Sequence, residues 1–153
     1  MAAPGELARL AEMLRSEGLP HTDLRFGARE RYMAATGSDG SLLGGVGLEL
    51  RKPHGLLRSL IVVRPARSSG LGRSLVAAAE KMARKQGVTT LYLLTPDASA
   101  FFVRLGYAET GREAVPPEIL GTGEFAGLCP ASAACLSKRL DTGPGQETGR
   151  VWR

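Results

Sequence analysis

A short loop in the middle of the chain carries residue types that suit phosphate binding. Residues 67–72 read Arg-Ser-Ser-Gly-Leu-Gly, after an apolar run and before a helical pattern. The start of a helix presents unpaired backbone N–H groups and about half a positive charge, which favour a pyrophosphate. Gly70 and Gly72 let the backbone approach phosphate oxygens, and Arg67 adds a charged donor. The spacing therefore predicts an anion-binding loop.

Two familiar phosphate loops do not match this segment. A Walker loop ends in Gly-Lys-Ser/Thr, whereas Arg73 follows Gly72 here. A dinucleotide fingerprint has a third glycine, and Leu75 lies near that place. Both interpretations are set aside.

The elements that must position this loop follow from the apolar periodicity. A nearly continuous apolar strand is expected at 56–63, and an amphipathic helix at 71–86. The inward stripe of that helix is predicted to comprise Leu71, Leu75, Ala78, Ala79, Met82 and Ala83. The other expected elements are helices at 6–17 and 97–105 and strands at 31–36, 42–50, 90–95, 107–110 and 132–140. This order predicts an α/β (α+β) domain, a mixed sheet with helices on both faces and a right-handed crossover from 56 to 95.

Composition and charge narrow the classes of protein. The chain has 153 residues, 43% of them hydrophobic, which suits one domain, predicted at 1–140 with a disordered tail at 141–153. The net charge is +5 but the cations are scattered, so nucleic acid ranks last among partners. No run approaches the ~20 apolar residues of a membrane span, and the start lacks a secretory-signal pattern. We expect a cytoplasmic protein without membrane, nucleic-acid or metal partners.

Two motifs give the chain a family resemblance. Arg67, Gly70 and Gly72 match R/Q-x-x-G-x-G/A, and residues 100–107 (AFFVRLGY) look like the segment A-x-F-Y-x-x-x-G-F/Y, at the usual separation. With these motifs the chain resembles the GCN5-related N-acetyltransferases (GNAT) over about residues 6–140. The run at 117–138 (PEILGTGEFAGLCPASAACLSK) is similar to the arsenic-resistance branch of that family.

The resemblance implies a direct transfer of acetyl from acetyl-CoA to the amine of a small molecule or amino acid in a ternary complex. It implies a sheet split into a V after the central strand, with pantetheine along that strand. The cofactor-binding residues would be Leu60, Ile61, Val62, Arg67, Ser68, Ser69, Gly70, Leu71, Gly72, Ser74 and Phe102. It also implies a possible homodimer. The branch suggests arsenic or toxin resistance, and acetylation of an ordinary amino acid competes with it.

The residues for proton transfer are less well defined by the sequence. The family's acidic tyrosine corresponds to Phe102, so Tyr107 or Tyr92 substitutes for it or the thiolate leaves unassisted. Phe102 also favours the alternative of a non-catalytic acetyl-CoA-binding module. Residues 56–63 contain no carboxylate, which leaves Glu49 and Glu124 as candidate bases; a solvated strand-end charge is the competing interpretation of Glu49.

Three further residues carry open alternatives. Arg58 interrupts an apolar strand, where it either binds a substrate carboxylate or points to solvent. Thr95 either contacts substrate or starts the turn before Pro96. Cys129 suits a soft element such as arsenic, but a buried thiol is the default for it and for Cys135, and the pair fits neither a disulfide scaffold nor a common zinc spacing.

Overall fold

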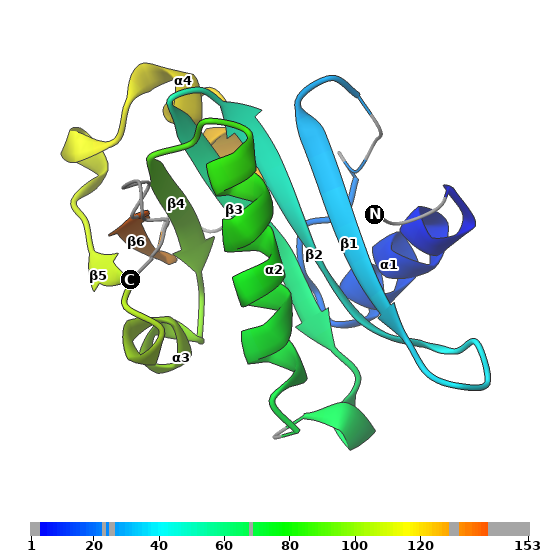
Figure 1. Ribbon diagram of the computed structural model, residues 1–153. Helices are drawn as coiled ribbons and strands as arrows, with labels where there is room; N and C mark the ends of the chain where they lie inside the picture. Colours follow the sequence, from blue (N-terminus) through cyan, green and yellow to red (C-terminus); the bar gives the residue numbers. More distant parts are fainter. Residues whose placement is uncertain (1–3, 23, 25–26, 68, 129–131, 141–153) are drawn as a thin grey trace, which may run out of the picture.

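The chain folds around a six-stranded sheet with strand order β1-β2-β3-β4-β6-β5 (Figure 1). The computed structural model describes residues 4–22, 24, 27–67, 69–128 and 132–140. The strands are β1 (Glu30–Thr36), β2 (Leu42–Arg51), β3 (His54–Val62), β4 (Thr90–Thr95), β5 (Ala108–Glu109) and β6 (Ala134–Arg139). Only β3 and β4 run parallel, and the other neighbours are antiparallel.

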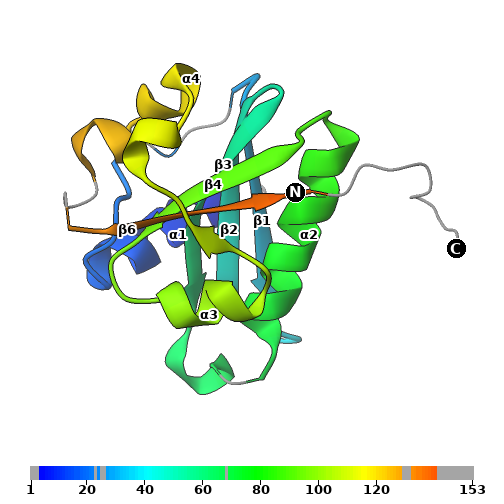
Figure 2. The same cartoon turned by 90° about the vertical axis from the view of Figure 1, so that its left-hand side faces the viewer.

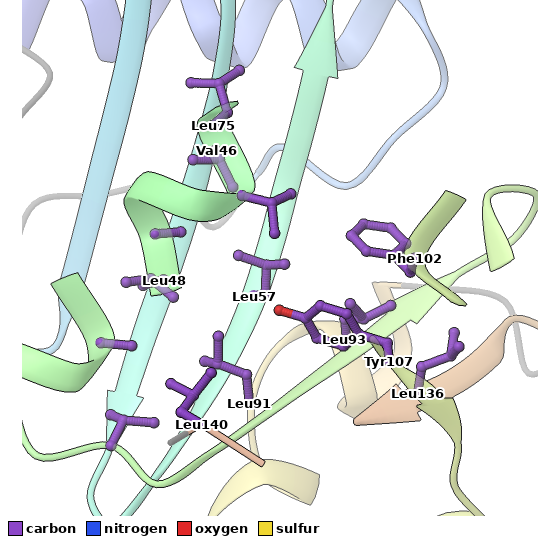
Figure 3. Packing of buried hydrophobic residues seen from close by; sticks show 14 of the residues in the cluster. Val46, Leu48, Leu57, Leu75, Leu91, Leu93, Phe102, Tyr107, Leu136 and Leu140 are labelled. Carbon is purple, nitrogen blue, oxygen red and sulfur yellow. The ribbon is translucent and has the colours of Figure 1, made fainter. Parts of the chain in front are cut away.

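Helices cover both faces of the sheet. α1 (Pro4–Ser16) packs on one face, where Leu7, Leu10 and Leu14 meet Tyr32 and Ile61. α2 (Leu71–Lys85) packs on the other face and belongs to the largest core cluster (Figure 3). The remaining helical segments are α3 (Ser99–Arg104), α4 (Pro117–Leu120) and short turns at Arg64–Ala66, Arg112–Ala114 and Glu124–Leu128. Figure 2 shows α1 and α2 on opposite sides of β1 and β2.

The sheet splits between its two parallel strands. β3 and β4 pair at His54↔Thr90, Gly55↔Leu91 and Leu56↔Tyr92, after which the strands diverge (Figure 1). β2 continues to pair with β3 as far as Val62, with a bulge because Gly45 opposes Ile61 and Gly47 opposes Arg58. The second half of β3 therefore has a hydrogen-bonded neighbour on one side and an opening on the other, which confirms the V-split sheet.

Most of the predicted elements are confirmed to within a few residues. β4 has the predicted bounds, and α2 begins at the predicted Leu71. The predicted inward stripe of α2 is wrong at Ala78, which is exposed, while Val76 and Glu80 are buried. The connection at 111–128 contains three short helical segments. The predicted tail at 141–153, Ser68 and Cys129 lie outside the described residues.

Candidate active site

A groove of about 610 Å³ lies at the open end of the V. The second half of β3, the start of α2 and the region of α3 form its walls. Three arginines line it, namely Arg67, Arg73 and Arg104, against the carboxylates of Glu17 and Asp97. Its other lining residues are Leu19, Leu60, Ile61, Val62, Gly70, Gly72, Ala98, Phe101 and Leu105. The groove therefore combines an apolar strip along β3 with more arginine than carboxylate side chains.

The loop before α2 has the geometry of an anion seat. Gly70 precedes the helix with φ of 88°, a conformation that favours glycine, and its missing Cβ would meet no atom within 4 Å. The first helical hydrogen bond runs from the Ser74 N–H to the Gly70 carbonyl at 3.0 Å. The amides of residues 71–73 thus precede the helical hydrogen-bond pattern, as at every helix start, and here they adjoin the groove. The residues present fit a phosphate-bearing ligand.

Arg67 joins this loop to the end of β3. Its Nε donates to the Val62 carbonyl oxygen at 2.9 Å, and its Nη2 lies 3.4 Å from Glu17 Oε1. The side chain remains partly exposed beside the groove. These bonds hold a guanidinium next to the helix start, where a phosphate would satisfy its remaining donors.

A smaller pocket, of about 120 Å³, continues the groove toward the centre of the V. The two cavities share Leu19, Leu60, Asp97 and Ala98. The walls of the smaller pocket are largely apolar and include Leu57, Leu93 and Phe102. Its polar groups come from Arg58, Ser59, Thr95, Asp97 and Glu124. A long ligand in the groove would therefore end beside a small, mostly apolar chamber with charged groups.

Arg58 links two buried carboxylates beside this chamber. Its Nη1 donates to Glu49 Oε1 at 3.0 Å, and its Nε lies 3.5 Å from Glu124 Oε2. Exposure is 3% for Arg58, 5% for Glu49 and 4% for Glu124. Arg51 Nη2 is a further donor to Glu49, at 3.3 Å. Pairing of this kind keeps two buried carboxylates compatible with the fold, because an isolated buried charge is costly.

Comparison with known proteins matches this geometry to one family. The "Acetyltransferase (GNAT) family" model matches residues 7–107, which include the loop and most of the groove. The chain belongs to the GNAT family. An uncharacterized N-acetyltransferase of Chlorobaculum tepidum is 38% identical over 79 residues, 52% of this chain and 48% of that protein. N-alpha-acetyltransferase 80 of Mus musculus is 42% identical over 59 residues, 38% of this chain and 19% of that protein.

Solved GNAT structures share the fold across nearly the whole chain. N-acetylglutamate synthase from Neisseria gonorrhoeae, complexed with coenzyme A and N-acetyl-glutamate, matches with a TM-score of 0.71 and 20% identity over 92% of this chain and 34% of that one. Tetrahymena GCN5 matches with a TM-score of 0.71 and 18% identity over 91% of this chain and 89% of that one. The chain spans about half the length of the first curated relative and about a third of the first of these structures.

Several residues predicted for a GNAT cofactor site lie at the two cavities, and others do not. Leu60, Ile61, Val62, Arg67, Gly70 and Gly72 line the groove, and Phe102 lines the smaller pocket. Ser69, Leu71 and Ser74 are not among the lining residues: the Ser69 hydroxyl bonds to the Ala66 carbonyl, Leu71 packs against the main core, and Ser74 is exposed.

Of the predicted catalytic and substrate residues, some line the smaller pocket and others do not. The smaller pocket is lined by Glu124, Arg58 and Thr95. Glu49 is not a lining residue but forms an ion pair with Arg58. Thr95 Oγ1 accepts the Ala98 N–H at 2.9 Å, which is the turn role that the sequence left open. Neither a solvated Glu49 nor a solvent-pointing Arg58 matches the structure, because β-sheet register places both side chains in the buried cluster.

Tyr107 lies elsewhere, although it was predicted as a catalytic acid. Figure 3 shows its ring in the main core with Leu93 and Leu136. Its hydroxyl donates to Glu80 Oε2 at 2.9 Å, and Lys138 Nζ bonds to the same carboxylate at 3.0 Å. Burial, with the neighbouring Glu80 charge, raises the pKa of Tyr107 well above its usual range. These contacts give Tyr107 a structural role rather than contact with a reacting atom.

Sequence reasoning missed Arg73, Arg104, Asp97 and Ser59. The two arginines are exposed helical residues, and nothing in their spacing distinguishes them from solvated charges. Ser59 did leave a signal, because Arg58 and Ser59 are consecutive polar residues inside an apolar run and so break strand alternation.

In the described part of the chain, the His, Cys, Asp and Glu side chains form no group of three or more that could hold a metal ion. Cys135 is buried, and burial raises the pKa of its thiol. Among the described helices, none has the length and apolar character needed to cross a bilayer.

Proposed function

We propose that this GNAT protein transfers the acetyl group of acetyl-CoA to the primary amine of a small molecule or amino acid, directly and in a ternary complex. One observation carries the proposal: a cationic groove along the split strand β3 opens into a small pocket beside Glu124. The family match and the coenzyme A complex of the N. gonorrhoeae enzyme support acetyl-CoA as the cosubstrate.

The chain's own residues divide the work of binding. The amides at the start of α2, with Arg67, hold the pyrophosphate, and Arg73 and Arg104 supply further positive charge. Leu60 and Val62 face the pantetheine with apolar side chains, while the β3 backbone beside the opening offers hydrogen bonds. Acetyl-CoA supplies an activated acyl group, and Phe102 excludes water from the pocket where that group would end.

Glu124 is the proposed general base. The amine nitrogen attacks the thioester carbonyl, a C–N bond forms, and the C–S bond breaks. Glu124, directly or through one water, takes the proton that the amine loses, and the thiolate leaves with the electron pair of the C–S bond. A thiol with a pKa of about 8.5 is a reasonable leaving group, so the reaction does not require an acid at the Phe102 position. Glu49 holds Arg58, and Arg58 in turn positions Glu124.

Experiment can identify the class of amine that accepts the acetyl group. Acetylation of an arsenical or another toxic amine rests on the resemblance at 117–138, whereas acetylation of an ordinary amino acid needs no such resemblance. A panel of amines and amino acids, with and without organoarsenicals, is assayed by thiol release from acetyl-CoA. A cytoplasmic location and a homodimer stay part of this proposal, and light scattering after size exclusion measures the second.

Glu124→Gln tests the assignment of the base. It should lower kcat by about 100-fold and leave the affinity for acetyl-CoA near the wild-type value. An unchanged kcat would refute the assignment. The second candidate is a non-catalytic acetyl-CoA-binding module, which Phe102 favours. Stoichiometric binding by the wild type with no thiol release for any amine would replace the first candidate by the second.

A further inference from the structure

Ser59 occupies the bulge of β3, beyond the point at which β3 and β4 separate. Its φ is 60°, and among the described residues no other non-glycine residue has a positive φ. A side chain in this conformation is strained, and such residues collect at functional sites because the surrounding structure must hold them there. The bulge and the split of the sheet together turn Ser59 toward the pocket, which it lines beside Leu60 and Phe102.

One hydrogen bond fixes the orientation of the Ser59 hydroxyl. Arg58 Nε donates to Ser59 Oγ at 3.0 Å, so the oxygen acts as the acceptor and its hydrogen is left to donate. No described residue accepts that hydrogen. A guanidinium that donates to a hydroxyl polarises it and strengthens it as a donor. The pocket beside β3 thus contains a positioned, polarised donor that the proposed mechanism does not otherwise use.

We propose that Ser59 is a further catalytic residue, whose hydroxyl donates a hydrogen bond to the thioester carbonyl oxygen as that oxygen gains negative charge. This inference rests on the proposed acetyl transfer. When the C–N bond forms, the carbonyl electron pair moves onto oxygen; it returns when the C–S bond breaks, and Ser59 keeps its proton throughout. One donor placed at such an oxygen contributes on the order of 10²–10³ in rate.

Two substitutions distinguish the effect of the Ser59 hydroxyl from the effect of the Ser59 backbone conformation. Ser59→Ala removes the hydroxyl and keeps the strained φ, whereas Ser59→Gly removes both, because glycine adopts a positive φ freely. Both variants should lose about 100-fold in kcat with little change in acetyl-CoA affinity, and the glycine variant should be the more thermally stable of the two. Ser41→Ala is the control: Ser41 Oγ bonds only to Asp39 in the β1–β2 turn, and the variant should keep wild-type kcat.

A spectroscopic readout tests Ser59 without any acceptor amine. Acetyl-CoA labelled with ¹³C at the carbonyl is bound to each protein, and the C=O stretch is measured by infrared difference spectroscopy. A hydrogen bond lowers this frequency, so both Ser59 variants should shift it upward from the wild-type value and Ser41→Ala should not.

Three results would overturn the inference. The first is full activity in Ser59→Gly with a loss of activity in Ser59→Ala, which would mean that only the backbone conformation matters. The second is an equal carbonyl frequency in all the proteins. The third is release of one equivalent of CoA in the absence of amine, which would mean that Ser59 forms an acyl-serine. If the wild type binds acetyl-CoA and acetylates no amine, the proposed function fails, and the carbonyl frequencies still decide whether Ser59 contacts the thioester.

Discussion

Replacing Arg58 by methionine should destabilise the protein severely. Methionine has a similar length, but it removes the cation that lies 3.0 Å from Glu49 Oε1 and 3.5 Å from Glu124 Oε2. Both carboxylates are buried, at 5% and 4% exposure, so neither can be solvated without rearrangement. Breaking a buried ion pair by removing one partner costs about 3–5 kcal/mol. For a domain of this length each kcal/mol lowers Tm by about 2–4 °C, so a loss on the order of 10 °C is expected.

Thermal and urea unfolding followed by circular dichroism measure this loss. Arg15→Met is the control, because Arg15 pairs with Glu12 on the surface of α1 and both side chains are more than half exposed; its Tm should not change measurably. A second variant that combines Arg58→Met with Glu49→Gln and Glu124→Gln should regain much of the stability, since the two buried side chains that lost the Arg58 cation no longer carry a charge. A loss below about 1 kcal/mol in Arg58→Met would refute the reasoning that the cluster depends on its cation.

Substitutions at two further positions have defined expected effects on acetyl-CoA binding and on stability. Gly70→Val should weaken acetyl-CoA binding, measured by calorimetry, at least about tenfold. Gly40→Val is the control and should not weaken it. Both glycines have φ above 80° with open space at Cβ, so the two variants should lose similar stability. Tyr107→Phe should leave kcat unchanged and lower stability by about 1 kcal/mol, because it removes one hydrogen bond to Glu80. Since the pKa of Tyr107 is raised in the fold, its contribution is present below pH about 10 and is lost as the pH rises further. Tm measured from pH 9 to 11 should therefore fall more steeply in the wild type than in Tyr107→Phe, and parallel curves would contradict this assignment.

The fold could be predicted because its signals are local. The apolar runs of β3 and β4 and the glycines around α2 each specify one element, and the order of the elements specifies a mixed sheet. The burial of Glu80 could not be predicted from its neighbours in the sequence. A charged residue on a helix is normally solvated, but Lys138 and Tyr107, which lie far away in sequence, make it a buried acceptor.

The loop before α2 could also be located from the sequence, since its glycines and backbone amides are contiguous; that it binds an anion stays a prediction. The reaction pocket could not. Glu49, Arg58 and Glu124 come together only through the β2–β3 register and a helical turn in the long connection. The polar pair Arg58–Ser59 marks the position of the bulge in the sequence, but the direction of the Ser59 side chain depends on the register of β3 against β2.

Calorimetric titration of the wild-type protein with acetyl-CoA at moderate salt measures whether the groove between β3 and α2 is the cosubstrate site. If the groove is that site, acetyl-CoA binds one-to-one in the micromolar range. Absence of binding by a protein shown to be folded would mean that the loop before α2 is only a structural turn, and would contradict the proposed function.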